Sequence, residues 1–376
     1  MIKSRRTERG QALVIVVFAI LALLVVAGLA IDGGMVFLER RRMQNAADAG
    51  ALAGTRVLVR GICGEAGTND AAVAAEVNHY AQVNGVKDVA NNVVADYVNF
   101  NELVLGRVGN GTIPNGAAGI SVTTRIQRAT YFVTLLGIDT AGASAGALAM
   151  SGRPLVGSGV RPFGIPRPVV VDLDSGDCFS ISFGQNCDDP DQCNVVYTGG
   201  QVQHRGWMNL DYVWRQQEEG AGFPRAQTHT PAGQLKTWMQ YGCDDTTLYA
   251  DGLWSQGYRN GDYVHAGPGT EQDVINVAPI GELIYVPVFD AFPDCDGEEP
   301  DIAEPHPEDA CRGGQGADYY HIVGFAGVRV QGTSTPNHSI DLCLEQTIWG
   351  QGQPSPNSGY GSNVCAMHTM VVALWR

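Results

Sequence analysis

Clustered positive charge is what this 376-residue sequence most lacks outside its first 60 residues. Those first 60 hold nine of the 24 Lys and Arg residues, and the rest of the chain is strongly acidic, so that the formal net charge is -15. Nucleic-acid binding needs clustered Lys and Arg to neutralise phosphates, so we expect no nucleic-acid partner. A basic end before an acidic body is typical of a membrane anchor that carries a solvated domain.

The sequence also lacks convincing local signatures of catalysis. It has no HExxH zinc helix and no P-loop, and we identify no nucleophile elbow. Its eight histidines are scattered singly, and a lone histidine is more often structural than a ligand. We therefore expect a protein that is not an enzyme and that needs no cofactor.

No CxxC pair occurs among the nine cysteines, which argues against a zinc or thiol-redox site. Eight of the nine lie beyond residue 170, with Cys63 alone near the N-terminus. In an oxidising compartment such a set predicts disulfides, although many connectivities are open. The candidate bridges, taken from chain order, are Cys187 with Cys193, Cys295 with Cys311, and Cys343 with Cys365.

What the sequence does have is one long apolar run, from Ala12 to Ile31, without charge or proline. Twenty helical residues span about 30 Å, the thickness of the hydrocarbon core of a bilayer. The basic residues before the run predict a cytoplasmic N-terminus and an outer body, although Arg40 to Arg42 on the other flank weaken this bias. The chain is thus expected in a bacterial cell membrane, single-pass, with its C-terminal body periplasmic or extracellular.

A cleaved signal peptide is the alternative, because Gly28 and Ala30 supply small residues that a signal peptidase reads. The run is longer than the roughly 7 to 15 apolar residues of such peptides, which favours a retained anchor. Apolar residues then recur at helical spacing from Met35 to Leu58, despite Gly33 and Gly34, so the helix is expected to continue outside the membrane.

Small residues dominate the second half of this expected helix. Ala46 with Gly50, and Gly50 with Gly54, are spaced four apart, which lets a neighbouring backbone approach closely. This face is therefore a docking surface. Its occupant is either the next domain of the same chain or another protein, and the sequence leaves both open.

The same segment resembles the N-terminal segment of TadG-like Flp pilus-assembly proteins. The residues that carry this family motif and docking helix are Gly10, Gln11, Asp32, Gln44, Asn45, Ala46, Ala47, Asp48, Ala49, Gly50, Ala53 and Gly54. A second resemblance to some of these proteins covers residues 281–290 and 320–326. The resemblance implies an envelope protein of a Tad-type secretion system, in contact with the lipid bilayer and with other Tad/Flp pilus envelope proteins.

The motif differs from that of processed pseudopilins in one position. The fifth residue after Gly10 is Ile15, where the resemblance to those proteins would require glutamate. We therefore expect a retained anchor rather than a mature filament subunit.

We predict an α+β fold: a single transmembrane helix extended outside the membrane, a small helix-plus-sheet domain, and a β-rich, disulfide-bearing distal domain. The expected boundaries are a basic tail over 1–11, a transmembrane helix over 12–31, an extended helix over 32–60, a membrane-proximal domain over 61–152, a Gly/Pro linker over 153–168 and a distal domain over 169–376. Expected elements include helices over 71–84 and 129–136 and strands over 93–105, 120–126, 141–150, 169–171, 178–183, 283–289, 321–330 and 367–375.

One acidic stretch, from Asp290 to Asp309, offers many oxygen ligands. Asp290, Asp294 and Asp296 are weak calcium candidates there, although such a charge run is usually a solvated loop. Asp172, Asp174 and Asp177 are weaker candidates still. The function expected first is a structural or assembly component of a Tad-type pilus. The alternative is an anchored or secreted binding or adhesion module, for which calcium dependence is one option.

Overall fold

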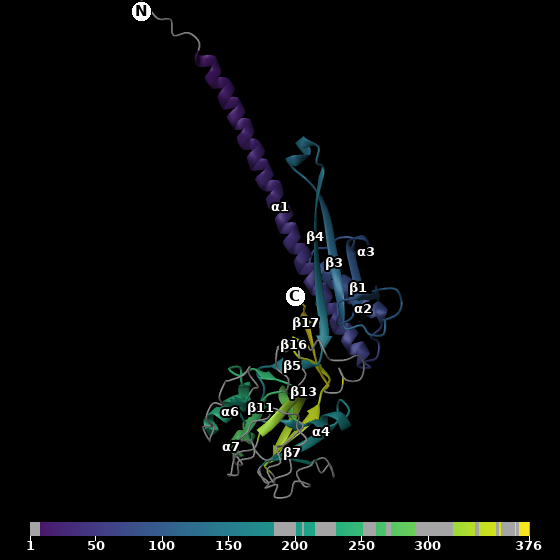
Figure 1. Cartoon of the computed structure of the whole chain (residues 1–376), viewed down its shortest axis with the longest axis vertical. Helices are drawn as coiled ribbons and strands as arrows, with labels where there is room; N and C mark the ends of the chain where they lie inside the picture. Colours follow the sequence, from purple (N-terminus) through teal and green to yellow (C-terminus); the bar gives the residue numbers. More distant parts are fainter. Residues whose placement is uncertain are drawn as a thin grey trace, which may run out of the picture.

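A computed structural model describes most of the chain and shows a long N-terminal helix that leads into two bodies (Figure 1). The described residues are 8–183, 201–204, 207–214, 231–250, 261–267, 272–289, 319–334, 338–350, 353–354, 365 and 368–375. The mixture of helix and sheet, with one long apolar helix at the N-terminus, confirms the predicted fold class.

Helix α1, Glu8–Ile62, runs for 55 residues without a break. Its apolar part is exposed from Leu13 to Ile31 apart from Gly28, whereas its second part has one buried side. The helix is long and apolar enough to be a candidate membrane span. Because Gly33 and Gly34 lie inside it, the predicted continuation of the helix beyond the apolar run is confirmed.

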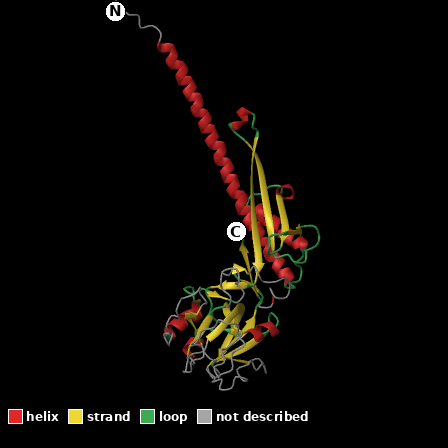
Figure 2. Ribbon diagram, viewed as in Figure 1, coloured by secondary structure: helices red, strands yellow, loops and turns green. Residues whose placement is uncertain are grey.

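The first body packs α1 and α2 (Asp70–Val83) on a six-stranded sheet (Figure 2). The helix α3 (Val89–Asn92) leads into this sheet. The strands that this sheet takes from the first half of the chain are β1 (Val93–Val98), β2 (Val104–Arg107), β3 (Gly119–Ala129) and β4 (Thr140–Gly152). Strands β3 and β4 form a long antiparallel hairpin in register from Gly119↔Met150 to Ala129↔Thr140, closed by the short 3-10 helix η1 (Val133–Leu136). On β3, Ile120, Val122 and Thr124 alternate toward the helices and are fully buried.

The second body is built on an eight-stranded sheet with a separate aromatic core. Its sheet strands are β6 (Ile165–Pro166), β7 (Cys178–Phe183), β8 (Gln201–His204), β9 (Trp207–Trp214), β11 (Tyr263–Gly267), β12 (Leu283–Phe289), β13 (Tyr319–Ser334) and β14 (Ser339–Leu344). A small sheet adds β5 (Pro154–Gly157), β10 (Leu248–Tyr249) and β16 (Gln353–Pro354), and the helices are α4 (Arg167–Asp172), α6 (Ala232–Tyr241) and α7 (Gln272–Ile275). The predicted strand over 169–171 is wrong, because these residues lie in α4, where Pro168 at the second helical position favours a helix start.

The chain returns to the first sheet at its C-terminal end. Strand β17 (Thr369–Leu374) pairs antiparallel with β4, with Val371 opposite Gly152, and β15 (Thr347–Ile348) pairs with β17. The predicted division had assigned all of residues 169–376 to one distal domain. In the structure the second body is instead inserted between two neighbouring strands of the first sheet.

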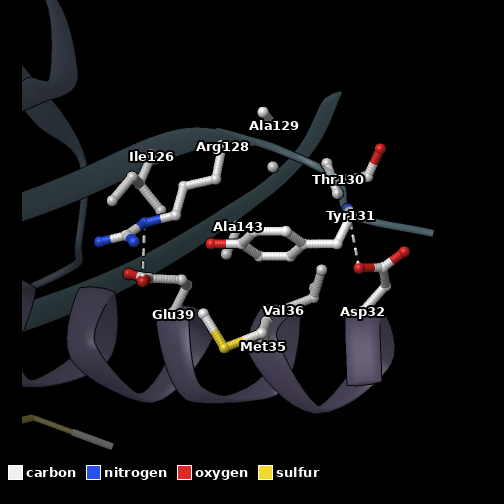
Figure 3. Close-up of a pocket in the computed structure, with 12 residues that line it drawn as sticks. Asp32, Met35, Val36, Glu39, Ile126, Arg128, Ala129, Thr130, Tyr131 and Ala143 are labelled. Carbon is white, nitrogen blue, oxygen red and sulfur yellow. Dashed lines mark hydrogen bonds and ion pairs between the residues drawn. The ribbon is translucent and has the colours of Figure 1, made fainter. Parts of the chain in front are cut away.

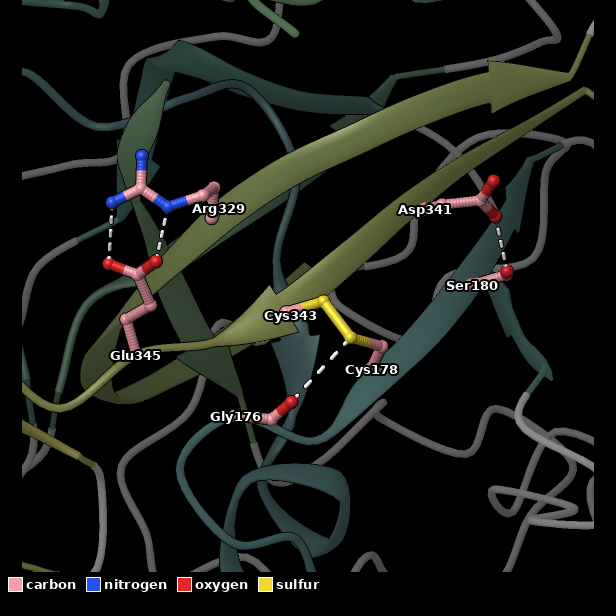
Figure 4. The surroundings of a disulfide bond; sticks show 7 residues. All are labelled: Gly176, Cys178, Ser180, Arg329, Asp341, Cys343 and Glu345. Carbon is pink, nitrogen blue, oxygen red and sulfur yellow. Dashed lines mark hydrogen bonds and ion pairs between the residues drawn. A yellow bond between two sulfur atoms is a disulfide. The ribbon is translucent and has the colours of Figure 1, made fainter. Parts of the chain in front are cut away.

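Two disulfides join segments that are distant in the sequence. Cys63, just past α1, pairs with Cys365, just before β17, and Cys178 on β7 pairs with Cys343 on β14 (Figure 4). The predicted bridge between Cys343 and Cys365 is therefore wrong. The other predicted bridges, Cys187 with Cys193 and Cys295 with Cys311, lie outside the described residues.

The strands around the second bridge carry further side-chain links. The guanidinium of Arg329 pairs with the carboxylate of Glu345, and the hydroxyl of Ser180 donates to Asp341 (Figure 4). These contacts fix β7, β14 and β13 side by side at this end of the sheet.

Peptide mapping without reduction is expected to recover Cys63 linked to Cys365 and Cys178 linked to Cys343. Cys243 is buried and free, and burial raises the pKa of its thiol, so alkylation should reach it only after unfolding. Replacing Cys63 and Cys365 by Ser should lower the free energy of unfolding by about 2 to 5 kcal/mol. Recovery of Cys343 linked to Cys365 would contradict this topology.

Candidate functional site

The candidate site is the part of α1 that leaves the apolar run and enters the first body. Asp32, the family-motif residue at the exit of the run, is buried, with 6% of its surface exposed. Its carboxylate accepts hydrogen bonds from the backbone N–H groups of Tyr131, Phe132 and Val133 at 3.0, 2.9 and 2.7 Å (Figure 3). A carboxylate is a strong acceptor for the free N–H groups that begin a helical turn, so Asp32 caps η1 and holds the β3–β4 hairpin on α1.

Two turns further along α1, Glu39 makes a second link to the hairpin. Its carboxylate is paired with Arg128 on β3 at 2.8 Å and with Arg42 on α1 at 3.1 Å. Between Asp32 and Glu39 lies a cavity of about 30 Å³, lined by residues that include Met35 and Ile126 (Figure 3). A space of this size holds about one water molecule, so it does not suit a cofactor.

Polar side chains continue this attachment along α1. The amide of Gln44 donates to Asp48 at 2.8 Å and to the carbonyl of Gly146 on β4 at 3.3 Å. The hydroxyl of Thr124 donates to the carbonyl of Met43, and that of Thr55 to the carbonyl of Ala149. Apart from the bond between Gln44 and Asp48, which lies within α1, these bonds join the helix to the hairpin and fix the register of the helix on the sheet.

The small-residue face is occupied by the chain itself. A Cβ atom on Gly54 would lie 2.5 Å from Cγ2 of Val77 and 2.9 Å from Cδ1 of Ile120, and one on Gly50 would lie 3.4 Å from the carbonyl oxygen of Val77. Ala46, Ala47 and Ala51 are fully buried in the same contact. Of the two occupants left open by the sequence, the structure shows α2 and the sheet of this chain.

The remaining motif residues divide into half-buried and exposed positions. Asp48, Ala49 and Ala53 are half-buried, whereas Asn45 is exposed. Gly10 and Gln11 lie in the first turns of α1, and their side chains are outside the described residues. The exposed part of α1 therefore keeps two polar motif residues, Gln44 and Asn45, of which Gln44 bonds to the hairpin.

Sequence reasoning missed another buried carboxylate, Asp70, at the start of α2. It accepts hydrogen bonds from the hydroxyl of Tyr97 at 2.7 Å and from the backbone N–H groups of Gly109 and Gly111. Burial raises the pKa of Asp70, but these donors outweigh that effect and leave the pKa below its usual value. The donors lie far along the chain, and the only local signal was a polar pair, Asn69 with Asp70, at a helix start.

One sequence pattern needs correction. The spelling GxSxG does occur, at residues 142–146, although we had identified no nucleophile elbow. It lies inside β4 rather than at a strand-to-helix turn, and the hydroxyl of Ser144 donates to the carbonyl of Thr124 at 3.0 Å. The serine therefore lies within a strand of a β-hairpin and not at a nucleophile elbow.

The structure shows no metal-binding cluster at those weak calcium candidates that it describes. Within the described ranges, no group of three or more His, Cys, Asp or Glu side chains is placed to hold a metal ion. Asp174 and Asp177 close a turn, in which the N–H of Asp174 donates to the carboxylate of Asp177 at 3.0 Å. Asp290, Asp294 and Asp296 lie outside the described residues.

The packing of α1 can be tested with two glycines of the same helix. Gly54→Ala should lower the free energy of unfolding by about 1 to 3 kcal/mol, because the new methyl group overpacks the contact with Val77. Gly34→Ala meets open space and should raise it by roughly 0.5 to 1 kcal/mol, since alanine favours helix. Unfolding of the full chain in detergent micelles measures both, and a neutral Gly54→Ala would contradict the close approach.

Comparison with known proteins places the motif in a family. Residues 10–75 match the family described as putative Flp pilus-assembly TadE/G-like. This match extends from the start of α1 into α2 and confirms the N-terminal resemblance, whereas residues 281–290 and 320–326 lie outside it. No curated protein and no solved structure gives a significant match. The N-terminal segment of this chain is thus similar to the TadE/G-like Flp pilus-assembly family.

Proposed function

We propose that this chain is a TadG-like, membrane-anchored, extracytoplasmic component that has a structural or assembly role in a Tad-type (Flp) pilus system, and that it is not an enzyme. One observation carries the proposal. The family segment, residues 10–75, contains one unbroken helix that is apolar and exposed in its first part and is the core helix of a globular body in its second part. Such a helix couples a bilayer mechanically to a folded domain.

The proposed orientation of the chain in the membrane rests on its charge distribution and on its disulfides. The basic residues before the apolar run favour a cytoplasmic N-terminus. The disulfides Cys63–Cys365 and Cys178–Cys343 suit an oxidising compartment on the other side of the membrane. Both features support a body that lies outside the cytoplasm.

The exposed face of α1 beyond the apolar run is the best candidate for contact with other pilus components. It carries Arg41, Asn45 and Arg56, which are all exposed. Arginine is enriched in protein interfaces because its guanidinium makes several directed hydrogen bonds. Since α2 and the sheet cover the opposite face, the partner of the helix in this proposal meets the arginine face.

Photocrosslinking in the native cell tests the proposal. A photoreactive amino acid at Asn45 should yield covalent adducts with another Tad/Flp envelope protein, identified by mass spectrometry. The same amino acid at Tyr241, which is 72% exposed on α6 of the second body, is the matched control and should yield no such adduct.

Topology is measured in the same cells by protease treatment of spheroplasts and by N-terminal sequencing. A protected body would contradict the extracytoplasmic placement, and cleavage near Ala30 would favour a secreted binding module. An anchored, accessible body without any pilus-protein adduct at Asn45 would leave the anchor in place and overturn the assembly role of the arginine face.

A further inference from the structure

The end of the β3–β4 hairpin exposes an apolar segment that the core of the first body does not use. Residues 131–138, here called the hairpin tip, contain no charged residue. Their large side chains are exposed: Leu135 by 84%, Tyr131 by 66%, Ile138 by 51% and Phe132 by 44%. Turns that face water are normally built from small and polar residues, so a cluster of this kind marks a contact with a membrane or a protein.

The hairpin tip lies beside the last turn of the apolar run of α1 (Figure 1). Gly28 is the buried residue of that run, and a Cβ atom there would lie only 2.7 Å from Cβ of Phe132. Asp32, one turn later, binds the backbone at the start of the tip. Because a helix rises about 1.5 Å per residue, the tip is held within about one turn of the expected outer end of the membrane span.

The backbone of the hairpin tip is prepared for an apolar environment. An N–H group without an acceptor is costly away from water, and membrane-embedded segments satisfy theirs internally. Asp32 accepts from the first three N–H groups of the tip. The N–H groups of Leu135, Gly137 and Ile138 donate to the carbonyl groups of Phe132, Thr134 and Val133, respectively.

The polar groups around the tip are ordered as at a membrane surface. The ring of Tyr131 lies along α1 over Met35 and Val36, and its hydroxyl points away from Asp32 toward Arg128 (Figure 3). Arg125 and Arg128 lie on β3, before the tip in the sequence, on the side where lipid headgroups would lie. Tyrosine is enriched at the membrane-water boundary, and arginine there is attracted to anionic lipids.

We propose that the hairpin tip inserts Phe132, Leu135 and Ile138 into the outer leaflet of the membrane that α1 spans, with Tyr131 at the headgroup level. The proposal rests on the proposed membrane anchoring by α1. Lipid is the occupant because the tip adjoins Leu29 and Ile31, which are 50% and 49% exposed and which face the bilayer if α1 spans it. The chain thereby holds the membrane at two places, and Asp32 is the positioning residue that ties them together.

Depth-dependent fluorescence quenching tests the insertion. The full chain, with an environment-sensitive fluorescent amino acid at Leu135, is reconstituted into vesicles of phosphatidylcholine and phosphatidylglycerol with brominated acyl chains. Leu23, which is 69% exposed in the apolar run, is the positive control, and Tyr241 is the negative control. We expect the probe at position 135 to lose most of its fluorescence, as at position 23, while position 241 keeps its signal.

The controls separate the insertion of the hairpin tip from the membrane anchoring by α1. Quenching at position 23 without quenching at position 135 overturns the insertion and leaves the anchor intact, as would happen if a protein covered the tip. Absence of quenching at position 23 overturns the anchor itself. Asp32→Ala should reduce quenching at position 135. Asp139→Ala, which removes a carboxylate that accepts a hydrogen bond from the Thr134 hydroxyl, should leave that quenching unchanged. Equal quenching in both variants would show that Asp32 does not position the tip.

Discussion

The structure depends on the close approach of α1 to α2 and to the β3–β4 hairpin, which only small residues on the helix permit. At Gly54 a single added methyl group would meet side chains of both α2 and β3. Around Gly50 and Gly54 the helix brings its backbone close to α2 and the sheet, whereas Met43 and Leu58, before and after them, bury full side chains. The consequence is that the helix which contains the candidate membrane span is also the core helix of the first body, so that no linker separates the two.

Polar contacts fix the position of α1 along the β3–β4 hairpin, which the small residues alone do not determine. A face of small residues does not by itself fix the axial position of a helix, but Asp32, Glu39 and Gln44 each bind a different point of the hairpin. Buried carboxylates need donors to offset desolvation, and the hairpin supplies backbone N–H groups to the first and a guanidinium to the second. At the far end of the same helix the returning C-terminal strand is held, since Cys63 is bonded to Cys365 and Val59 packs on Met370 of β17.

Local sequence patterns predicted those features that have local causes. The apolar run, the helical spacing from Met35 to Leu58 and the alternation of Ile120, Val122 and Thr124 in β3 are each signals that one segment carries by itself. The partners of the motif residues could not be predicted, because Asp32 meets residues about a hundred positions later and Asp70 meets a loop beyond β2. The same holds for the cysteines: chain order suggested neighbours, but the sheet brings Cys178 opposite Cys343 and the return of β17 brings Cys365 to Cys63. The return of the last strand to the first sheet has no local signature at all.

The central claim is that one rigid helix joins the membrane span to the first body through Gly33 and Gly34. A direct test is the distance between two spin labels, carried by non-cysteine amino acids at the exposed positions Leu23 and Arg56, in the full chain in lipid nanodiscs. An unbroken helix predicts a narrow distribution centred at about 50 Å, since each residue adds about 1.5 Å along the axis. A broad distribution, or one centred well below that distance, would show that the helix breaks at the glycine pair and would contradict the account.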